Sequence, residues 1–137
     1  RGDGEGGAQW TGKAGLERDE ERGGVALGRC GGKPSWCVNR ATGYAWGDYL
    51  VQELPKKLAG WFPISPEGKD RRVMGVGTGG YGALMAAQNA PDSFAGAAAV
   101  NPVFEVSCLY GTDYEPKPEY HFGEKEALAS PGYALST

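Results

Sequence analysis

Apolar residues along the chain gather in short blocks that predict buried strands. Residues 25–27, 73–76 and 95–100 are such blocks, each only a few residues long and rich in valine or alanine. Short apolar runs bounded by turn residues are typical of strands buried in a sheet. The three blocks therefore predict the strands of a small sheet.

Two segments between these blocks have helical spacing. Residues 79–89 form one predicted helix, with Pro91 just beyond it. Residues 48–61 form the other, although Pro55 interrupts it and predicts a kink or a late start. Its apolar side chains recur on one face, namely Leu50, Val51, Leu54, Leu58 and Trp61. Strands alternating with helices over short connections predict an α/β fold with parallel strands.

The two ends of the chain have a different character. Residues 1–24 are rich in glycine and charge and almost without apolar periodicity, which predicts a disordered or extended arm. Residues 25–137 then form the single predicted domain. Towards the C-terminus, Pro116 and Pro118 favour an extended loop over residues 114–120, and a helical turn is expected over residues 124–129.

Composition excludes several classes of function. The net charge of −3 lacks the basic excess typical of nucleic-acid binding. No apolar run approaches the roughly 20 residues of a membrane-spanning helix. The three cysteines form no Cys-x-x-Cys pair and His121 is the single histidine, so we expect no metal site. A Cys30–Cys37 disulfide is an open but disfavoured alternative. Nothing in the sequence indicates a compartment.

The richest candidate for chemistry is the glycine-packed turn between residues 72 and 84. Gly75, Gly77 and Gly80 have the G-x-G-x-x-G spacing that holds a dinucleotide phosphate between a strand and a helix. The same strand-to-helix corner is also typical of the nucleophile elbow G-x-S-x-G of serine hydrolases. In that second motif, the position of the serine is Gly77.

Several motifs around this turn resemble one enzyme family. Residues 46–55 resemble the helix before the elbow in the esterase D and S-formylglutathione hydrolase group, and in the related mycolyltransferases. Residues 79–84, Gly-Gly-Tyr-Gly-Ala-Leu, are similar to the sequence after their serine, and residues 89–95 resemble their link to the next strand. The resemblance covers roughly residues 25–135. It implies a truncated α/β-hydrolase fold, a three-layer sandwich with a small, mostly parallel sheet of three or four strands.

The resemblance also implies what chemistry is missing. In the family a serine attacks an acyl carbonyl, with a histidine as base and a carboxylate to orient it. The serine position falls on Gly77, while the backbone N–H of Thr78 remains as a residual oxyanion donor. The acid and histidine would lie beyond Thr137, and His121 comes too early. Thr78 and Cys108 have no evident base beside them.

These observations favour a non-catalytic protein, and two alternatives stay open. One is an acyl-ester or thioester hydrolase, as a fragment or a nucleophile-substituted form. The other is a dinucleotide-binding module using Gly75, Gly77 and Gly80. Asn101 stands where that module has its ribose-binding acid, so we expect no cofactor.

A sheet of three or four strands leaves edges and apolar faces that proteins normally cover. We therefore expect other protein chains as partners in a hetero-assembly. Tryptophan dominates interface hot spots, and the expected anchors are Trp36, Trp46 and Trp61.

Overall fold

A computed structural model describes part of the 137-residue chain, namely residues 24–28, 36–41, 43–113, 117–125, 128 and 135. The chain divides into two compact units, Arg1–Pro34 and Ser35–Thr137. In the first unit only residues 24–28 are described, so the predicted arm lies almost wholly outside the described residues. Residues 25–27 are not in a strand, so the strand predicted there is wrong.

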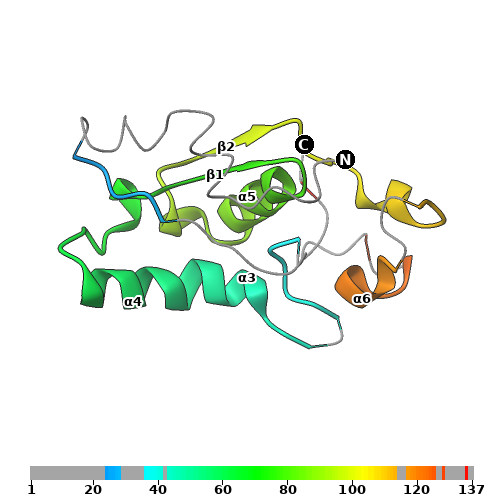
Figure 1. Cartoon of the computed structure of the whole chain (residues 1–137), viewed down its shortest axis with the longest axis horizontal. Coiled ribbons are helices and arrows are strands. Elements are labelled where there is room, and N and C mark those ends of the chain that lie inside the picture. Colours follow the sequence, from blue (N-terminus) through cyan, green and yellow to red (C-terminus); the bar gives the residue numbers. More distant parts are fainter. Residues whose placement is uncertain are drawn as a thin grey trace. The chain divides into compact units, whose positions relative to one another are not determined.

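The second unit is built on two parallel strands. The strands β1 (Arg72–Val76) and β2 (Gly96–Val100) pair in parallel from Arg72 with Gly96 to Val76 with Val100. The sheet of the described residues thus has two strands, fewer than the three or four expected. Between them in sequence runs the helix α5 (Thr78–Asn89), which packs against both strands (Figure 1).

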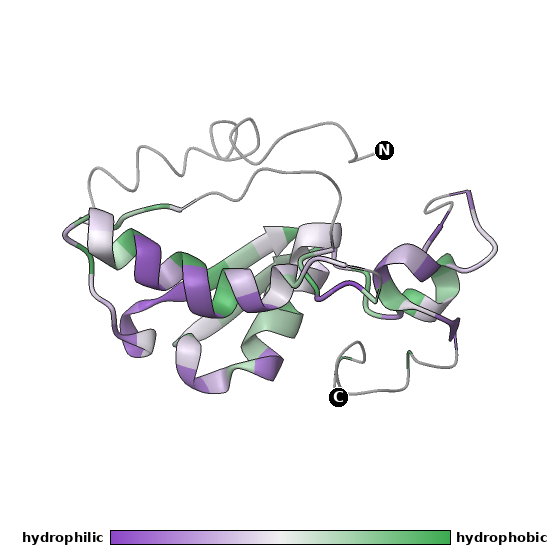
Figure 2. Cartoon of the chain, turned by 90° about the horizontal axis from the view of Figure 1, so that it is seen from below, coloured by the Kyte–Doolittle hydropathy of each residue, from purple (hydrophilic) through white to green (hydrophobic). Residues whose placement is uncertain are grey.

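The helical stretch before β1 is continuous but changes its winding. It consists of α3 (Trp46–Asp48), the π-helix η1 (Tyr49–Glu53) and α4 (Leu54–Trp61). Pro55 is in the first turn of α4, where its missing N–H is least costly. The predicted irregularity is therefore a π-turn just before the proline. Figure 2 shows polar positions in purple and apolar ones in green along this helix.

Short 3₁₀ turns and one more helix complete the described elements. The turns are η2 (Gly68–Asp70), η3 (Pro91–Ser93) and η4 (Val106–Leu109). The helix α6 (Glu119–Phe122) begins inside the predicted loop, so that expectation is wrong for its last residues. Pro118, the N-cap, has φ −61° and ψ −26°, values that suit a helix start. Gly123 follows α6 with φ 79° and ends this helix. Within the helical turn expected over residues 124–129, the described residues Lys125 and Leu128 have 3₁₀ conformation.

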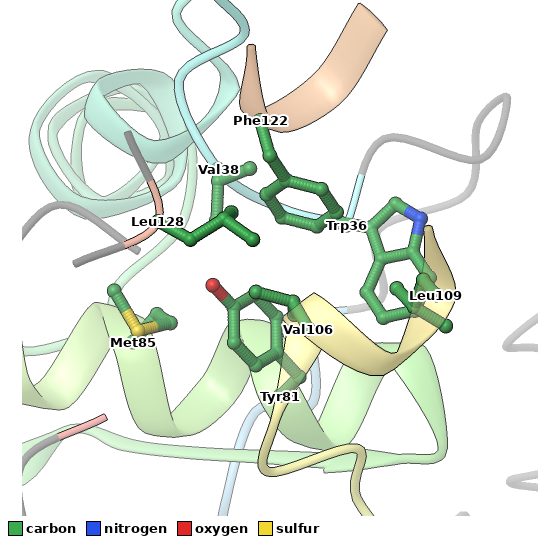
Figure 3. Close-up of a cluster of buried hydrophobic side chains, with 8 residues drawn as sticks. All are labelled: Trp36, Val38, Tyr81, Met85, Val106, Leu109, Phe122 and Leu128. Carbon is green, nitrogen blue, oxygen red and sulfur yellow. The ribbon is translucent and has the colours of Figure 1, made fainter. Parts of the chain in front are cut away.

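The core lies on α5 and draws on segments far apart in the sequence. Three aromatic rings, those of Trp36, Tyr81 and Phe122, meet edge to face, with centroids 5.4–6.0 Å apart. Edge-to-face pairs stabilise a core beyond the area that they bury. Figure 3 shows this core cluster, which consists of Trp36, Val38, Tyr81, Met85, Val106, Leu109, Phe122 and Leu128.

Candidate functional site

The glycine-rich turn is a one-residue corner between β1 and α5. Gly77 alone separates the strand from the helix, with φ 58° and ψ −121°. Its N–H donates to the carbonyl of Val100 at 3.0 Å, and its own carbonyl accepts from Gly80 at 3.0 Å and from Tyr81 at 3.2 Å. This backbone conformation is nearly restricted to glycine. The strand-to-helix corner that the sequence predicts is present, and Gly77 lies at its turn with a positive φ.

The other two glycines of the motif permit close contact between strand and helix. A Cβ atom on Gly75 would overlap the carbonyl oxygen of Gly79. A Cβ on Gly80 would lie 3.1 Å from Cβ of Pro102 and 3.3 Å from Cβ of Ala99. Each glycine of the G-x-G-x-x-G pattern thus has a packing or backbone role that needs no nucleotide.

The space above Gly77 is open. A Cβ built on Gly77 meets no atom of the described residues within 4 Å. A side chain here would stand clear of its surroundings, which is how an elbow presents a nucleophile. The next residue, Thr78, opens α5, and the first N–H groups of a helix have no partner in its own ladder. The corner therefore has an elbow's shape and a candidate donor, without a nucleophilic side chain.

The candidate base His121 and the candidate nucleophile Cys108 both make contacts that serve the fold. His121 is buried in α6, where its ring lies 6.1 Å from that of Phe122 and its carbonyl accepts from the N–H of Ala41. Cys108 is an exposed free thiol that donates to the carbonyl of Glu105 at 2.8 Å. Hydrogen bonds from Ser107 hold the pKa of the Glu105 carboxyl below its ordinary value. Glu105 thus caps its own turn, η4.

The three tryptophans expected as interface anchors have different environments. Trp36 is only 3% exposed and belongs to the core, so its side chain packs inside this chain and offers almost no surface to a partner. Trp46 is half-buried, with its ring 5.9 Å from that of Tyr49 and 6.5 Å from that of Tyr44. Trp61, at the end of α4, is 70% exposed. Of the three expected anchors, Trp61 is the one that presents most of its surface to solvent.

A shallow groove of about 340 Å³ lies between the α3–η1 stretch and α5. Its lining includes Cys37, Asp48, Gln52, Met85 and Asn89, and it does not include the glycines of the corner. Across the described part of the chain, no cluster of three or more His, Cys, Asp or Glu side chains is arranged to hold a metal ion. No described helix is long and apolar enough to cross a membrane.

Comparison with known proteins places this corner in a family. The family model named Esterase, described as "Putative esterase", matches residues 36–132. The chain belongs to this esterase family. The match includes the corner at Gly77 and the core around Tyr81, so the resemblance derived from the motifs is confirmed.

Solved structures show the fold of this esterase-family chain. FphF of Staphylococcus aureus, a fluorophosphonate-binding serine hydrolase with substrate bound, matches with a TM-score of 0.81 and 24% identity. The match covers 96% of this chain and 53% of FphF. MPT51 (FbpC1) of Mycobacterium tuberculosis matches with a TM-score of 0.65 and 22% identity, over 85% of this chain and 48% of MPT51. The α/β-hydrolase fold class is thereby confirmed.

The esterase-family chain spans about half the length of these two solved structures. Among curated proteins, the comparison found none that matches the chain.

Proposed function

We propose that this chain is a non-catalytic, esterase-derived subunit that acts by binding another polypeptide. The observation that carries the proposal is Gly77, which stands at the elbow position in elbow geometry and offers no atom for attack. Loss of the nucleophile in a serine hydrolase costs about 10⁶-fold in kcat. The corner keeps the geometry of an elbow but lacks the attacking atom. This combination favours a fold that is retained for binding and not for catalysis.

A second candidate function has its own supporting observation. The open space at Gly77 would accept a side chain, so a nucleophile-substituted acyl-ester or thioester hydrolase remains the alternative. That alternative needs a base and an orienting acid from polypeptide beyond this chain. Dinucleotide binding has less support, because packing accounts for Gly75 and Gly80.

Hydrolysis and active-site labelling separate the two candidates. We expect the chain to leave p-nitrophenyl acetate unhydrolysed above a heat-denatured control, and to take no label from a fluorophosphonate probe. FphF serves as the positive control for labelling, since it is a fluorophosphonate-binding serine hydrolase. Turnover by the unaltered chain that the fluorophosphonate blocks would overturn the proposed function.

The variant Gly77→Ser tests the alternative directly. We expect this variant to remain unlabelled, because a serine hydroxyl without a base is a weak nucleophile. A side chain at this φ and ψ introduces backbone strain of about 1–3 kcal/mol, so Gly77→Ala is the matched control with the same strain and no hydroxyl. Labelling of the serine variant but not of the alanine variant would favour a nucleophile-substituted hydrolase.

A further inference from the structure

The groove between the α3–η1 stretch and α5 has an apolar floor and a polar rim. Val38, Met85 and Ala86 line it and are almost fully buried, and the first two belong to the core cluster drawn in Figure 3. Asp48 and Gln52 also line it and are exposed. Pockets with an apolar lining and a few polar groups are typical of small-molecule sites, and the volume of about 340 Å³ is within their usual range.

The wall formed by the start of α3 is held in place by Asn39. The Oδ1 atom of Asn39 accepts from the N–H of Asp48 at 3.0 Å, and Asn39 also pairs with Ala45 in an antiparallel bridge. A Cβ on Gly47 would lie 3.0 Å from the same Oδ1 atom, so glycine permits this close approach. A wall that is fixed before binding lowers the entropic cost of holding a ligand.

Two departures from regular backbone occur along this groove. Val51 and Gln52, which line it, belong to the π-helix η1. Cys37, which also lines it, has φ 57° and follows Trp36, which has φ 53°. Both π-turns and non-glycine residues in the left-handed region are uncommon, and both recur at functional sites. Their coincidence distinguishes this groove from the rest of the described surface.

The charges along the groove favour a cation. The carboxylate of Asp48 stands on its rim, and no lysine, arginine or histidine occurs among its described lining residues. The helix α5 also ends there, since its last residue Asn89 and its C-cap Ala90 line the groove. The C-terminal end of a helix carries a partial negative charge, and the last turn of α5 contains no basic residue to offset it.

An anion is disfavoured at the same place. The start of a helix can bind an anion through its free N–H groups, and α3 starts beside the groove. However, the N–H of Asp48 already donates to Asn39, and the N–H of Tyr49 donates to the carbonyl of Ala45 at 3.0 Å. The carboxylate of Asp48 would also repel an anion.

We propose that this groove binds an ammonium group carried on an apolar chain. The ammonium group lies near Asp48 and the C-terminal end of α5, and the apolar chain covers Val38 and Met85. The glycines of the corner do not line the groove. The proposal therefore goes beyond the proposed function and does not depend on it.

Three ligands with the same carbon chain and different charges test the proposal, namely n-hexylamine, hexan-1-ol and hexanoate. Each is titrated into the chain while the backbone amide signals are followed by NMR. We expect hexylamine to bind at least about tenfold more tightly than hexanoate, because like charges placed together are unfavourable. The shifts should centre on Asp48, Gln52 and Asn89. Equal affinity for amine and carboxylate, or shifts scattered over the chain, would overturn the proposal.

The variant Asp48→Asn removes the charge while keeping the shape of the side chain. It should weaken hexylamine binding by about threefold to fivefold, the size of an exposed ion pair, and leave hexan-1-ol binding unchanged. Asp113→Asn is the matched control, since Asp113 is exposed and lies outside the described lining. Both variants change exposed carboxylates, so their melting temperatures should match that of the unaltered chain. Equal effects of the two variants on hexylamine binding would contradict the role of Asp48.

Two cysteines give a second readout on the unaltered chain. Cys37 and Cys108 are free thiols, of which Cys37 lines the groove and Cys108 does not. Hexylamine at about ten times its dissociation constant should slow the reaction of Cys37 with methyl methanethiosulfonate by about fivefold or more, by mass action. The reaction of Cys108 should keep its rate. Equal slowing of both thiols would show that the amine does not bind in the groove.

An ammonium group on an apolar chain occurs both in free alkylamines and in the side chain of lysine. The probe N-acetyl-lysine methylamide, titrated beside hexylamine, distinguishes these sources. Tighter binding of the lysine probe would assign the groove to a lysine of a polypeptide, and tighter binding of hexylamine would assign it to a small molecule; either result supports an ammonium site. Binding of neither probe would overturn the proposal.

Discussion

At the scale of single residues, the glycines of the corner have different structural roles. Gly77 adopts a backbone conformation that other residues reach only under strain, while Gly75 brings α5 against β1. The sequence predicted the position of this corner, since so many glycines at a strand-to-helix junction have few explanations. It did not show the open space above Gly77, which depends on residues that fold around the turn.

Gly82 gives a direct test of packing at α5. A Cβ at this position would lie 2.5 Å from Cβ of Cys37 and 2.9 Å from the carbonyl oxygen of Trp36. Overpacking of this kind costs about 1–3 kcal/mol. We therefore expect Gly82→Ala to lower the free energy of unfolding by that amount, measured by urea denaturation.

Gly79 provides the matched control on the same helix. A Cβ there meets no atom of the described part of the chain within 4 Å, and alanine is a better helix former than glycine by about 1 kcal/mol. Gly79→Ala should be neutral or slightly stabilising. Equal destabilisation by both variants would contradict the packing described at Gly82.

At the scale of elements, the strands and the central helix were predictable, and the rest depended on distant contacts. The predicted segments 73–76, 79–89 and 95–100 agree with β1, α5 and β2 to within one residue. An apolar run, a glycine corner and a following proline are local signals, and they determine these boundaries. The π-turn before Pro55 has no local signal beyond the proline itself, and α6 begins where two prolines favoured a loop.

Burial of Trp36 illustrates the limit of local patterns. Its neighbours in the core are Tyr81 and Phe122, which lie far along the chain. A tryptophan in a glycine-rich and polar segment is therefore indistinguishable, from sequence, from one exposed at an interface. Only the tertiary arrangement shows that Trp36 is a core residue and that Trp61 is exposed.

The short helix α6 packs against the core cluster through Phe122. Phe122 is fully buried and makes edge-to-face contacts with Trp36 and Tyr81. Truncation of a buried phenylalanine costs about 3–5 kcal/mol. We expect Phe122→Ala to lower the free energy of unfolding by this amount, measured by thermal or urea denaturation.

Tyr120 is the control for that variant, since it lies on the same helix and is half-exposed. Surface substitutions usually change stability by less than about 0.5 kcal/mol, so Tyr120→Ala should have little effect. A small loss from Phe122→Ala would mean that α6 is not anchored in the core as described.

At the scale of the whole molecule, the described residues combine a well-packed core with a two-stranded sheet that is exposed on one side. The core cluster on α5 is almost fully buried, while Met74 and Val100 on the opposite side of the sheet are about half-exposed. The fold class and the family followed from sequence motifs, and the family match confirms them. The sequence did not predict which surface of the sheet is exposed, because that depends on which face of the sheet α5 covers.

The last prediction concerns this open surface in the chain alone. An exposed apolar face should bind the dye ANS, and dye fluorescence should fall by about half or more in the double variant Met74→Ser/Val100→Ser, since exposed apolar patches are binding surfaces. The melting temperature should not fall, because the replaced side chains contribute little burial in the isolated chain. Trp61→Ser is the control, because it distinguishes dye bound at Met74 and Val100 from dye bound at the end of α4. Undiminished dye binding, together with a lowered melting temperature, would show that Met74 and Val100 are buried in solution and that the chain closes its own sheet.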